Sequence, residues 1–141
     1  MGRVSPEKVQ RHAVWLALAR ASFGAPAVAA PDTLARLLGL TRRSRDDGSR
    51  FFGGFFGVRE LLLGGFILAA RRDPAKLAPT VLFGALADLG DTAFLVREVT
   101  RRGRLEPATA SLLGSGVAGS AASIALWWEA RQAGNEAVAD A

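Results

Sequence analysis

The chain alternates between long apolar stretches and short segments that hold most of its charged residues. Each stretch has about 20 residues, and a helix of that length, rising 1.5 Å per residue, crosses a hydrocarbon core of roughly 30 Å. The pattern predicts transmembrane helices over residues 9–30, 51–70, 77–97 and 108–128. The last segment contains no charged residue, so it favours a membrane-embedded fold over a soluble one.

Residues that begin and end helices frame these segments. Ser5 and Pro6 form a favourable helix start, and residues 71–74 close the second span with charges and a proline. Between the first two spans, residues 32–40 place several leucines on one face, which predicts a short amphipathic helix in the membrane interface. The polar stretch 41–50 that follows is predicted to be a solvated loop.

The predicted fold class is therefore all-α. We expect an integral membrane four-helix bundle with the short interfacial helix between the first and second spans. Residues 1–130 are predicted to form a single transmembrane domain, because a chain of 141 residues has room for only one modest domain. Residues 131–141 form a polar C-terminal tail, either a helical extension or disordered.

The net charge of +5 is compatible with nucleic-acid binding, but the Arg residues lie mainly between the apolar runs. Basic residues at that position flank membrane spans and meet anionic headgroups. We therefore predict a multi-pass protein of the cell membrane, with the lipid bilayer as its partner and no nucleic acid. Lys and Arg are divided too evenly between the two sides to fix the orientation. The first stretch also fits a signal peptide, although Arg20 interrupts it.

Ionisable residues inside the predicted spans are the strongest candidates for chemistry. Each costs on the order of 3 kcal/mol at the centre of a lipid-facing helix, so we expect these side chains to meet in the interior of the bundle. Gly53, Gly57 and Gly64 share a face of the second span with Glu60, which predicts that Glu60 contacts a neighbouring helix. The intramembrane ionisable residues are Arg20, Arg59, Glu60, Asp88 and Asp91.

The two aspartates of the third span, Asp88 and Asp91, lie one helical turn apart on one face. That face is predicted to oppose Arg20 or Arg59, because otherwise two like charges would be buried side by side. We expect Arg59 to pair across the bundle with Asp88 or Asp91. Its neighbour Glu60 lies about 100° away around the same helix and is not expected to be its partner.

The charge of this cluster points to acid–base chemistry. Three carboxylates against two guanidinium groups leave one negative charge uncompensated, so one carboxyl, Asp88 or Glu60 rather than Asp91, is expected to be protonated. Such a group is a proton donor or relay, and the cluster also suits the polar head of an amphipathic ligand. The structural alternative is a set of interhelical ion pairs that only orients the helices. The catalytic candidates are Glu60, Asp88 and Asp91, and the substrate-binding candidates are Arg20, Arg59 and Thr92.

Other chemistries have little support. Cysteine is absent, which excludes disulfides, thiolate metal sites and Cys nucleophiles. Asp88-x-x-Asp91 is similar to the Mg²⁺-binding pairs of membrane prenyl transferases, but the second acidic motif is missing, so we expect no metal and no cofactor. His12 lies near the start of the first span without partner residues beside it in the sequence, so we expect a solvated or headgroup-contacting side chain and no catalytic dyad. Residues 114–119 match G-x-G-x-x-G without a preceding strand, and we assign them instead to a helix-packing face of small residues: Ser111, Ser115, Gly119 and Ala122.

Several short motifs carry a resemblance to a known family. The specific ones are Gly57-x-Arg59-Glu60 and Asp88-x-x-Asp91, and residues 25–40 and 61–64 contribute to it. With them the chain resembles an uncharacterised family of small, mostly actinobacterial, four-helix membrane proteins, broadly similar to the DoxX-like group. The resemblance implies a four-helix membrane bundle and supplies no established reaction. The chain departs from the redox members of related bundles because it has no cysteine.

Three functions are compatible with these features. The leading hypothesis is that the polar site binds a lipophilic small molecule with a polar head, with acid–base chemistry of the isomerase or cyclase type. The second is a non-enzymatic accessory subunit of a larger membrane complex, and the third is a small proton-coupled transporter. Whether the protein is an enzyme, and whether it forms a homo-oligomer, is left open. A binding site requires an accessible cavity at Glu60 or Asp88, whereas a structural network requires closed ion pairs.

Overall fold

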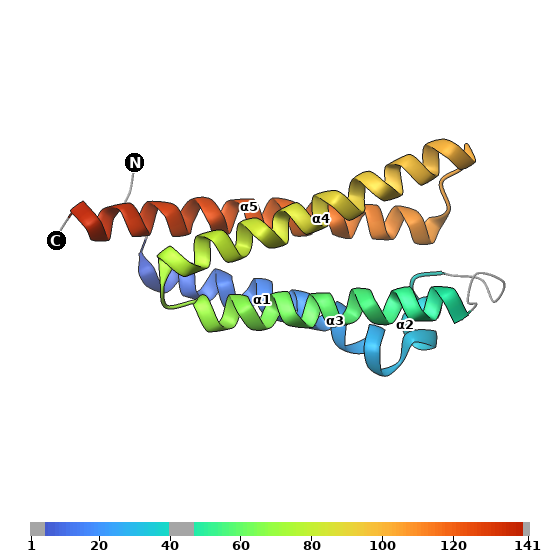
Figure 1. Ribbon diagram of the computed structural model, residues 1–141, viewed down its shortest axis with the longest axis horizontal. Helices are drawn as coiled ribbons and strands as arrows, with labels where there is room; N and C mark the ends of the chain where they lie inside the picture. The colour runs from blue at the N-terminus through green and yellow to red at the C-terminus, as the bar shows by residue number, and fades with distance from the viewer. Residues whose placement is uncertain (1–4, 40–46, 140–141) are drawn as a thin grey trace.

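The computed structural model describes residues 5–39 and 47–139, and the secondary structure of these residues is entirely helical. The helices are α1 (Pro6–Ala29), α2 (Pro31–Leu37), α3 (Asp47–Ala70), α4 (Pro74–Arg102) and α5 (Pro107–Ala139). The predicted all-α class is confirmed. The four long helices run up and down in two layers, α1 beside α3 and α4 beside α5, with both chain ends at the same end of the bundle (Figure 1).

Side-chain caps set the starts of two long helices. The hydroxyl of Ser5 accepts a hydrogen bond from the backbone N–H of Lys8 at 3.2 Å, as expected of an N-cap. The carboxylate of Asp73 does the same for α4, because it accepts from the backbone N–H groups of Ala75 and Lys76 at 3.1 and 3.3 Å. In both helices a proline occupies the first turn, where its missing N–H costs nothing. The predicted helix start at Ser5 is confirmed.

The helices extend beyond the predicted apolar spans. α3 begins at Asp47, inside the predicted loop 41–50, and residues 40–46 of that loop lie outside the described residues. α4 continues to Arg102, and α5 continues to Ala139 through the segment predicted as a tail. Polar residues are compatible with a helix that has left an apolar environment, so the change in polarity marks the end of an apolar span and not the end of the helix.

Two glycines bring α1 and α3 into close contact. A Cβ atom on Gly24 would lie 2.8 Å from the backbone oxygen of Gly57, and a Cβ on Gly57 would lie 2.8 Å from the backbone oxygen of Gly24. Only glycine fits at such a crossing, as at other small-residue helix contacts. Gly64 also approaches α1, because its Cβ would lie 3.1 Å from the backbone oxygen of Ala17. Gly57 and Gly64 of the predicted small-residue stripe therefore pack against α1, whereas Gly53 lines the cavity described below.

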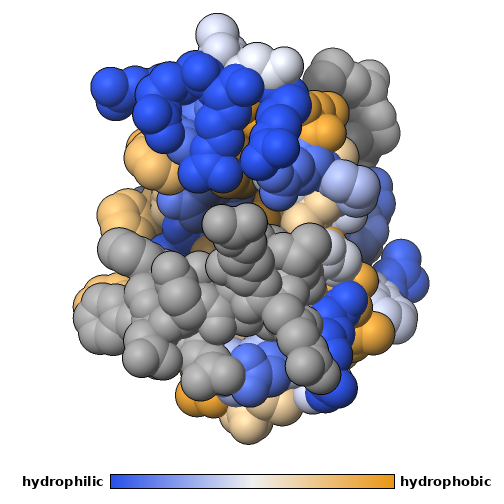
Figure 2. Space-filling model, turned by 90° about the vertical axis from the view of Figure 1, so that its right-hand side faces the viewer, coloured by the Kyte–Doolittle hydropathy of each residue, from blue (hydrophilic) through white to orange (hydrophobic). Residues whose placement is uncertain are grey.

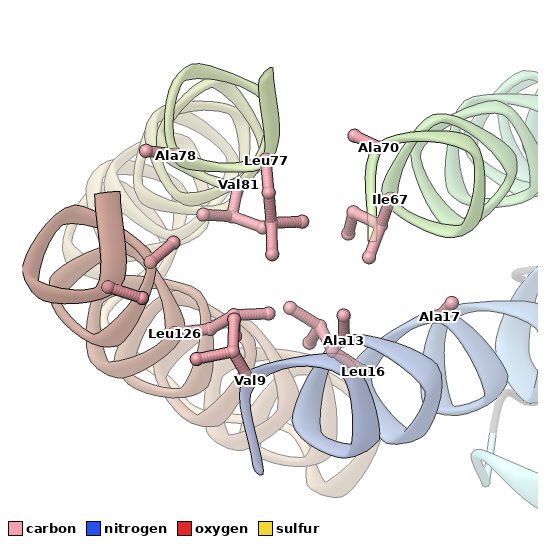
Figure 3. Close-up of a cluster of buried hydrophobic side chains, with 12 residues drawn as sticks. Val9, Ala13, Leu16, Ala17, Ile67, Ala70, Leu77, Ala78, Val81 and Leu126 are labelled. Atoms are coloured by element: carbon pink, nitrogen blue, oxygen red, sulfur yellow. The ribbon is translucent and has the colours of Figure 1, made fainter. Parts of the chain in front are cut away.

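One half of the bundle is closed by a packed apolar core. α1, α3, α4 and α5 all contribute to it, and Figure 3 shows the larger side chains converging between the helices. Several of them have no exposed surface, including Ile67, Leu77 and Val81. We call this part the closed half and define it by its buried apolar residues: Val9, Ala13, Leu16, Ala17, Ile67, Ala70, Leu77, Ala78, Val81, Leu126, Ala130 and Ala133.

The outer surface carries many large apolar side chains, and Trp15, Phe66 and Phe83 are each more than half exposed. Within residues 5–39 and 47–139, three helical segments are long and apolar enough to cross a membrane: Gly53–Ala70 of α3, Pro74–Arg102 of α4 and Pro107–Asn135 of α5. They correspond to the second, third and fourth predicted spans. α1 is not among them, because polar residues including Arg20 interrupt its apolar sequence. The first predicted span, residues 9–30, and with it the count of four membrane spans, is thus not confirmed.

Candidate functional site

A buried network of charged side chains lies at the centre of the bundle, where the four long helices meet. Arg20 of α1 is only 4% exposed. Its Nη1 donates to Oε2 of Glu60 at 2.8 Å, and its Nη2 donates to Oδ2 of Asp88 at 2.7 Å. Nη2 also donates to Oγ of Ser123 at 3.2 Å. One guanidinium group therefore ties α1 to α3, α4 and α5.

A second guanidinium group extends the network along α3. Arg59 donates from Nη2 to Oε1 of Glu60 at 2.6 Å and from Nη1 to Oδ2 of Asp91. Its Nη2 lies 3.5 Å from Oδ1 of Asp88. Its guanidinium carbon lies 4.9 Å from the centre of the Phe56 ring, a cation–π arrangement. Glu60 and Asp88 thus each contact both guanidinium groups, whereas Asp91 contacts Arg59 alone among the described residues.

Glycines on the facing helices make room for these charges. A Cβ on Gly84 of α4 would lie 3.0 Å from Nη2 of Arg20, and a Cβ on Gly119 of α5 would lie 3.0 Å from Oδ2 of Asp88. Both distances are tighter than ordinary carbon contacts. The Arg20 side chain can extend across the interior because Gly84, on the helix opposite it, has no side chain in its way. The sequence therefore places small residues where the network passes between helices.

The structure confirms much of the predicted cluster. Arg20, Glu60 and Asp88 are buried together, and Arg59 pairs with Asp91 across the bundle. One expectation is wrong, because Arg59 also pairs with its neighbour Glu60. Their Cα atoms are separated by about 100° around the helix, but the long Arg side chain bends back across that angle.

Ser123 is a member of the network that the sequence analysis missed. The predicted packing face of α5 is confirmed at Gly119, which approaches Asp88, but it is wrong at Ser111 and Ala122, which are exposed. Ser120 and Ser123 are buried instead, and their spacing of one turn in the uncharged part of α5 was the available indication. Ser123 supplies an acceptor for a buried Arg, a role that an alanine at this position does not fill.

A cavity of about 840 Å³ opens beside the network, between the α1–α3 layer and the α4–α5 layer. The network residues form its polar part, and α2 covers part of its length. Most of the remaining wall is apolar, and it includes Phe23, Leu38, Phe94, Leu95 and Leu112. We call this part of the bundle the cavity half. It comprises the C-terminal part of α1, α2, the N-terminal parts of α3 and α5, and the C-terminal part of α4.

The polar groups of the cavity differ in accessibility. The side chains of Glu60 and Asp88 are 7% and 8% exposed, whereas that of Asp91 is 47% exposed. Thr92 also lines the cavity, and its hydroxyl donates to the backbone oxygen of Asp88 at 2.7 Å. Its oxygen remains able to accept a hydrogen bond. A molecule in the cavity therefore meets Asp91, Thr92 and the half-exposed Arg59 before it meets the buried pairs.

Separate ion pairs lie toward the two ends of the bundle. At the end with the chain termini, Nδ1 of His12 lies 2.7 Å from Oε2 of Glu129, and Nζ of Lys8 lies 3.1 Å from the other oxygen. At the opposite end, Arg101 and Arg102 of α4 pair with Glu98. Figure 2 shows hydrophilic residues gathered over the α4–α5 layer at this end. These pairs tie helices or turns together and do not line the cavity.

The structure thus defines a helical bundle with an apolar surface, a buried Arg/Glu/Asp network and a cavity beside it. No protein-family model, no curated protein and no solved structure matches the chain. The geometry of the site therefore carries the functional argument.

Proposed function

We propose that the protein is a multi-pass membrane protein of the cell membrane that binds a lipophilic small molecule in its cavity, with the polar head at Asp91, Thr92 and Arg59. The observation that carries this proposal is the cavity itself, which reaches the charged network. Its volume of about 840 Å³ lies within the range of roughly 300–1,000 Å³ that suits small-molecule sites. A network that served only to align the helices would need no such space.

Membrane insertion as a four-helix bundle is supported by the surface of α1. Trp15, Leu18 and Val28 are exposed on this helix and do not line the cavity, whereas Arg20 is buried. The residue that lowers the apolar character of α1 therefore faces the interior, where its charge is paired. A lipid molecule outside the bundle meets an apolar face on α1 as it does on α3, α4 and α5. Water cannot solvate such a surface favourably.

Acid–base chemistry, if the bound molecule reacts, is best supplied by Asp91. Glu60 and Asp88 are each held by two guanidinium groups and are almost fully buried. Asp91 has one Arg partner among the described residues and the most exposed side chain of the three acids. Its carboxylate retains free lone pairs at the cavity, as a general base requires. An isomerase or cyclase reaction would thus use Asp91 as the proton-transfer group and Arg59 to orient it.

A second candidate function is favoured by the completeness of the ion pairs. Every carboxylate of the network contacts an Arg, so the set orients four helices without help from a ligand. In this case the protein is an accessory subunit whose apolar outer faces bind other membrane proteins. The two functions differ in one respect: an accessory subunit has no need of an occupant in the cavity.

The test is native mass spectrometry of the protein released from membranes with detergent, after an alkaline carbonate wash has shown that it stays with the membrane. Ser115 lines the cavity on α5, and Ser115→Phe fills part of that space. Val117 is on the same helix but exposed outside the cavity, so Val117→Phe is the matched control. We expect a bound lipophilic molecule on the wild type and on Val117→Phe, and its loss from Ser115→Phe. A wild-type protein with an empty cavity contradicts ligand binding and favours the accessory subunit.

A further inference from the structure

The charges that face the cavity are unequal in number. Among the described network residues that line it, two guanidinium groups, those of Arg20 and Arg59, stand against the three carboxylates of the network. With all of these groups ionised, the described network has a surplus of one negative charge. α5 contributes no charged side chain to this lining, so nothing from that helix offsets the surplus.

We propose that the natural ligand of this cavity is a cationic amphiphile, an apolar chain or ring system that ends in an ammonium group. This inference rests on the proposed function, because it specifies the chemical class of the molecule that the cavity binds. The ammonium group lies at Asp91 and the apolar part lies along the wall of the cavity half.

The geometry at Asp91 suits a cation better than an anion or a neutral head. One carboxylate oxygen of Asp91 pairs with Arg59, and a carboxylate has about four acceptor sites, so a second cation has room to bind. An anionic head would have to displace Asp91 from Arg59 while lying beside Glu60 and Asp88, the two other acids of the network. A cation instead reduces the local excess of negative charge, and this attraction is stronger at the surface of a protein than in bulk water.

Aromatic side chains at the cavity also favour a cationic head group. Phe23, Phe56 and Phe94 all line it, and Phe56 already holds the guanidinium group of Arg59 over its ring at 4.9 Å. Aromatic faces attract ammonium and quaternary ammonium groups in the same way. The remaining wall is aliphatic, which matches the apolar part of an amphiphile and leaves the head group as the element that sets specificity.

The experiment compares three probes that share one chain and differ in head-group charge: dodecyltrimethylammonium, dodecanol and dodecanoate. The purified full-length protein in maltoside detergent is mixed with equal amounts of the three, and native mass spectrometry measures the occupancy of each. We expect the ammonium probe to bind about tenfold more than the alcohol, and the carboxylate probe to bind least. Ser115→Phe should reduce the binding of all three, because it fills the shared cavity.

Two variants that each remove one carboxylate test where the ammonium group binds. Asp91→Asn removes the accessible carboxylate, and we expect it to bring the ammonium-to-alcohol ratio severalfold closer to one. Glu98→Gln removes a carboxylate from the same helix outside the cavity, and we expect it to leave the ratio unchanged. An unchanged ratio in Asp91→Asn would overturn the assignment of the head group to this residue.

The outcomes separate the two proposals. If Ser115→Phe blocks binding but the alcohol or carboxylate probe binds as well as the ammonium probe, the cavity function stands and the cationic ligand is wrong. If no probe binds the wild type, or Ser115→Phe binds all three normally, the proposed function itself fails.

Discussion

The closed half and the cavity half use the same four long helices but are held together by different interactions. In the closed half, side chains such as Ile67, Leu77 and Val81 fill the space between the layers and leave no exposed surface. In the cavity half, a cavity of about 840 Å³ separates the α1–α3 layer from the α4–α5 layer. Arg20 lies where the two halves meet and connects all four long helices.

The difference shows how a small bundle keeps an open site without losing its fold. Each layer stays tight along the cavity: Gly24 and Gly57 bring α1 against α3, and a Cβ on Gly116 of α5 would lie 2.5 Å from Oγ1 of Thr92 on α4. The opening therefore lies between the layers and not within them. Packing in the closed half fixes the layers at one end, and the ion network fixes them at the middle. Stability thus rests on the closed half and the network, and the proposed ligand binding belongs to the cavity half.

The largest effect is expected from Arg20→Met, which breaks the connection between the halves. It leaves Glu60 and Asp88 buried without their shared partner, and removing one partner of a buried ion pair costs about 3–5 kcal/mol. Thermal unfolding of the detergent-solubilised protein measures the loss. Arg101→Met is the control, because its pair with Glu98 is exposed and is expected to contribute about 0–1 kcal/mol. Equal losses in the two variants would show that the network does not hold the layers together.

A smaller effect is expected from shortening one apolar side chain in each half. Ile67 is completely buried in the closed half, so Ile67→Ala is expected to lower the free energy of unfolding by about 2–4 kcal/mol. Leu95 lines the cavity, where part of its side chain already faces open space, and Leu95→Ala is expected to cost about 1 kcal/mol. Denaturation of both variants in the same detergent tests the contrast. A Leu95→Ala loss as large as that of Ile67→Ala would mean that the cavity half is packed.

Much of this comparison could be predicted from the sequence. The apolar runs predicted the long helices, and the cost of a charge in lipid predicted that Arg20, Glu60 and Asp88 meet inside. The glycine stripe containing Gly57 predicted the contact of α3 with a neighbour. Each of these inferences uses the periodicity of residues within one helix, and that periodicity can be read from the sequence.

The features that could not be predicted depend on how the helices are placed relative to one another. Periodicity within one helix carries no information on that placement. Ser123 was missed because its role follows from the position of Arg20 on another helix. The pairing of Arg59 with Glu60 follows from a side-chain bend and not from helical spacing. The membrane status of α1 depends on the direction in which Arg20 points, whereas an average over its sequence counts that charge wherever it lies. The resemblance to the DoxX-like group stays a proposal.

The smallest expected effect concerns Asp73, which begins α4 at the closed end of the bundle. Its side chain accepts from two backbone N–H groups and lies 3.1 Å from Nζ of Lys76, and these interactions, led by the hydrogen bond with Lys76, hold the pKa of Asp73 below its ordinary value of 3.8. A carboxylate with a lowered pKa in the folded state stabilises the fold above its unfolded pKa, and this contribution is lost as the pH falls through the folded value.

In Asp73→Asn the amide oxygen still caps α4, but the charge that attracts Lys76 is gone. We therefore expect the unfolding midpoint of Asp73→Asn to lie slightly below that of the wild type at about pH 7, where the aspartate is ionised. The two midpoints should converge as the pH falls through the lowered pKa of Asp73 in the folded state, because the wild-type carboxyl is then protonated and resembles the amide. Because every other acid titrates equally in both proteins, the difference between the two curves reports Asp73 alone. A difference that persists unchanged at the acid end would show that Asp73 acts through the neutral cap and not through its charge. The stability of the closed half would then rest on packing and backbone hydrogen bonds, with no measurable part from this surface ion pair.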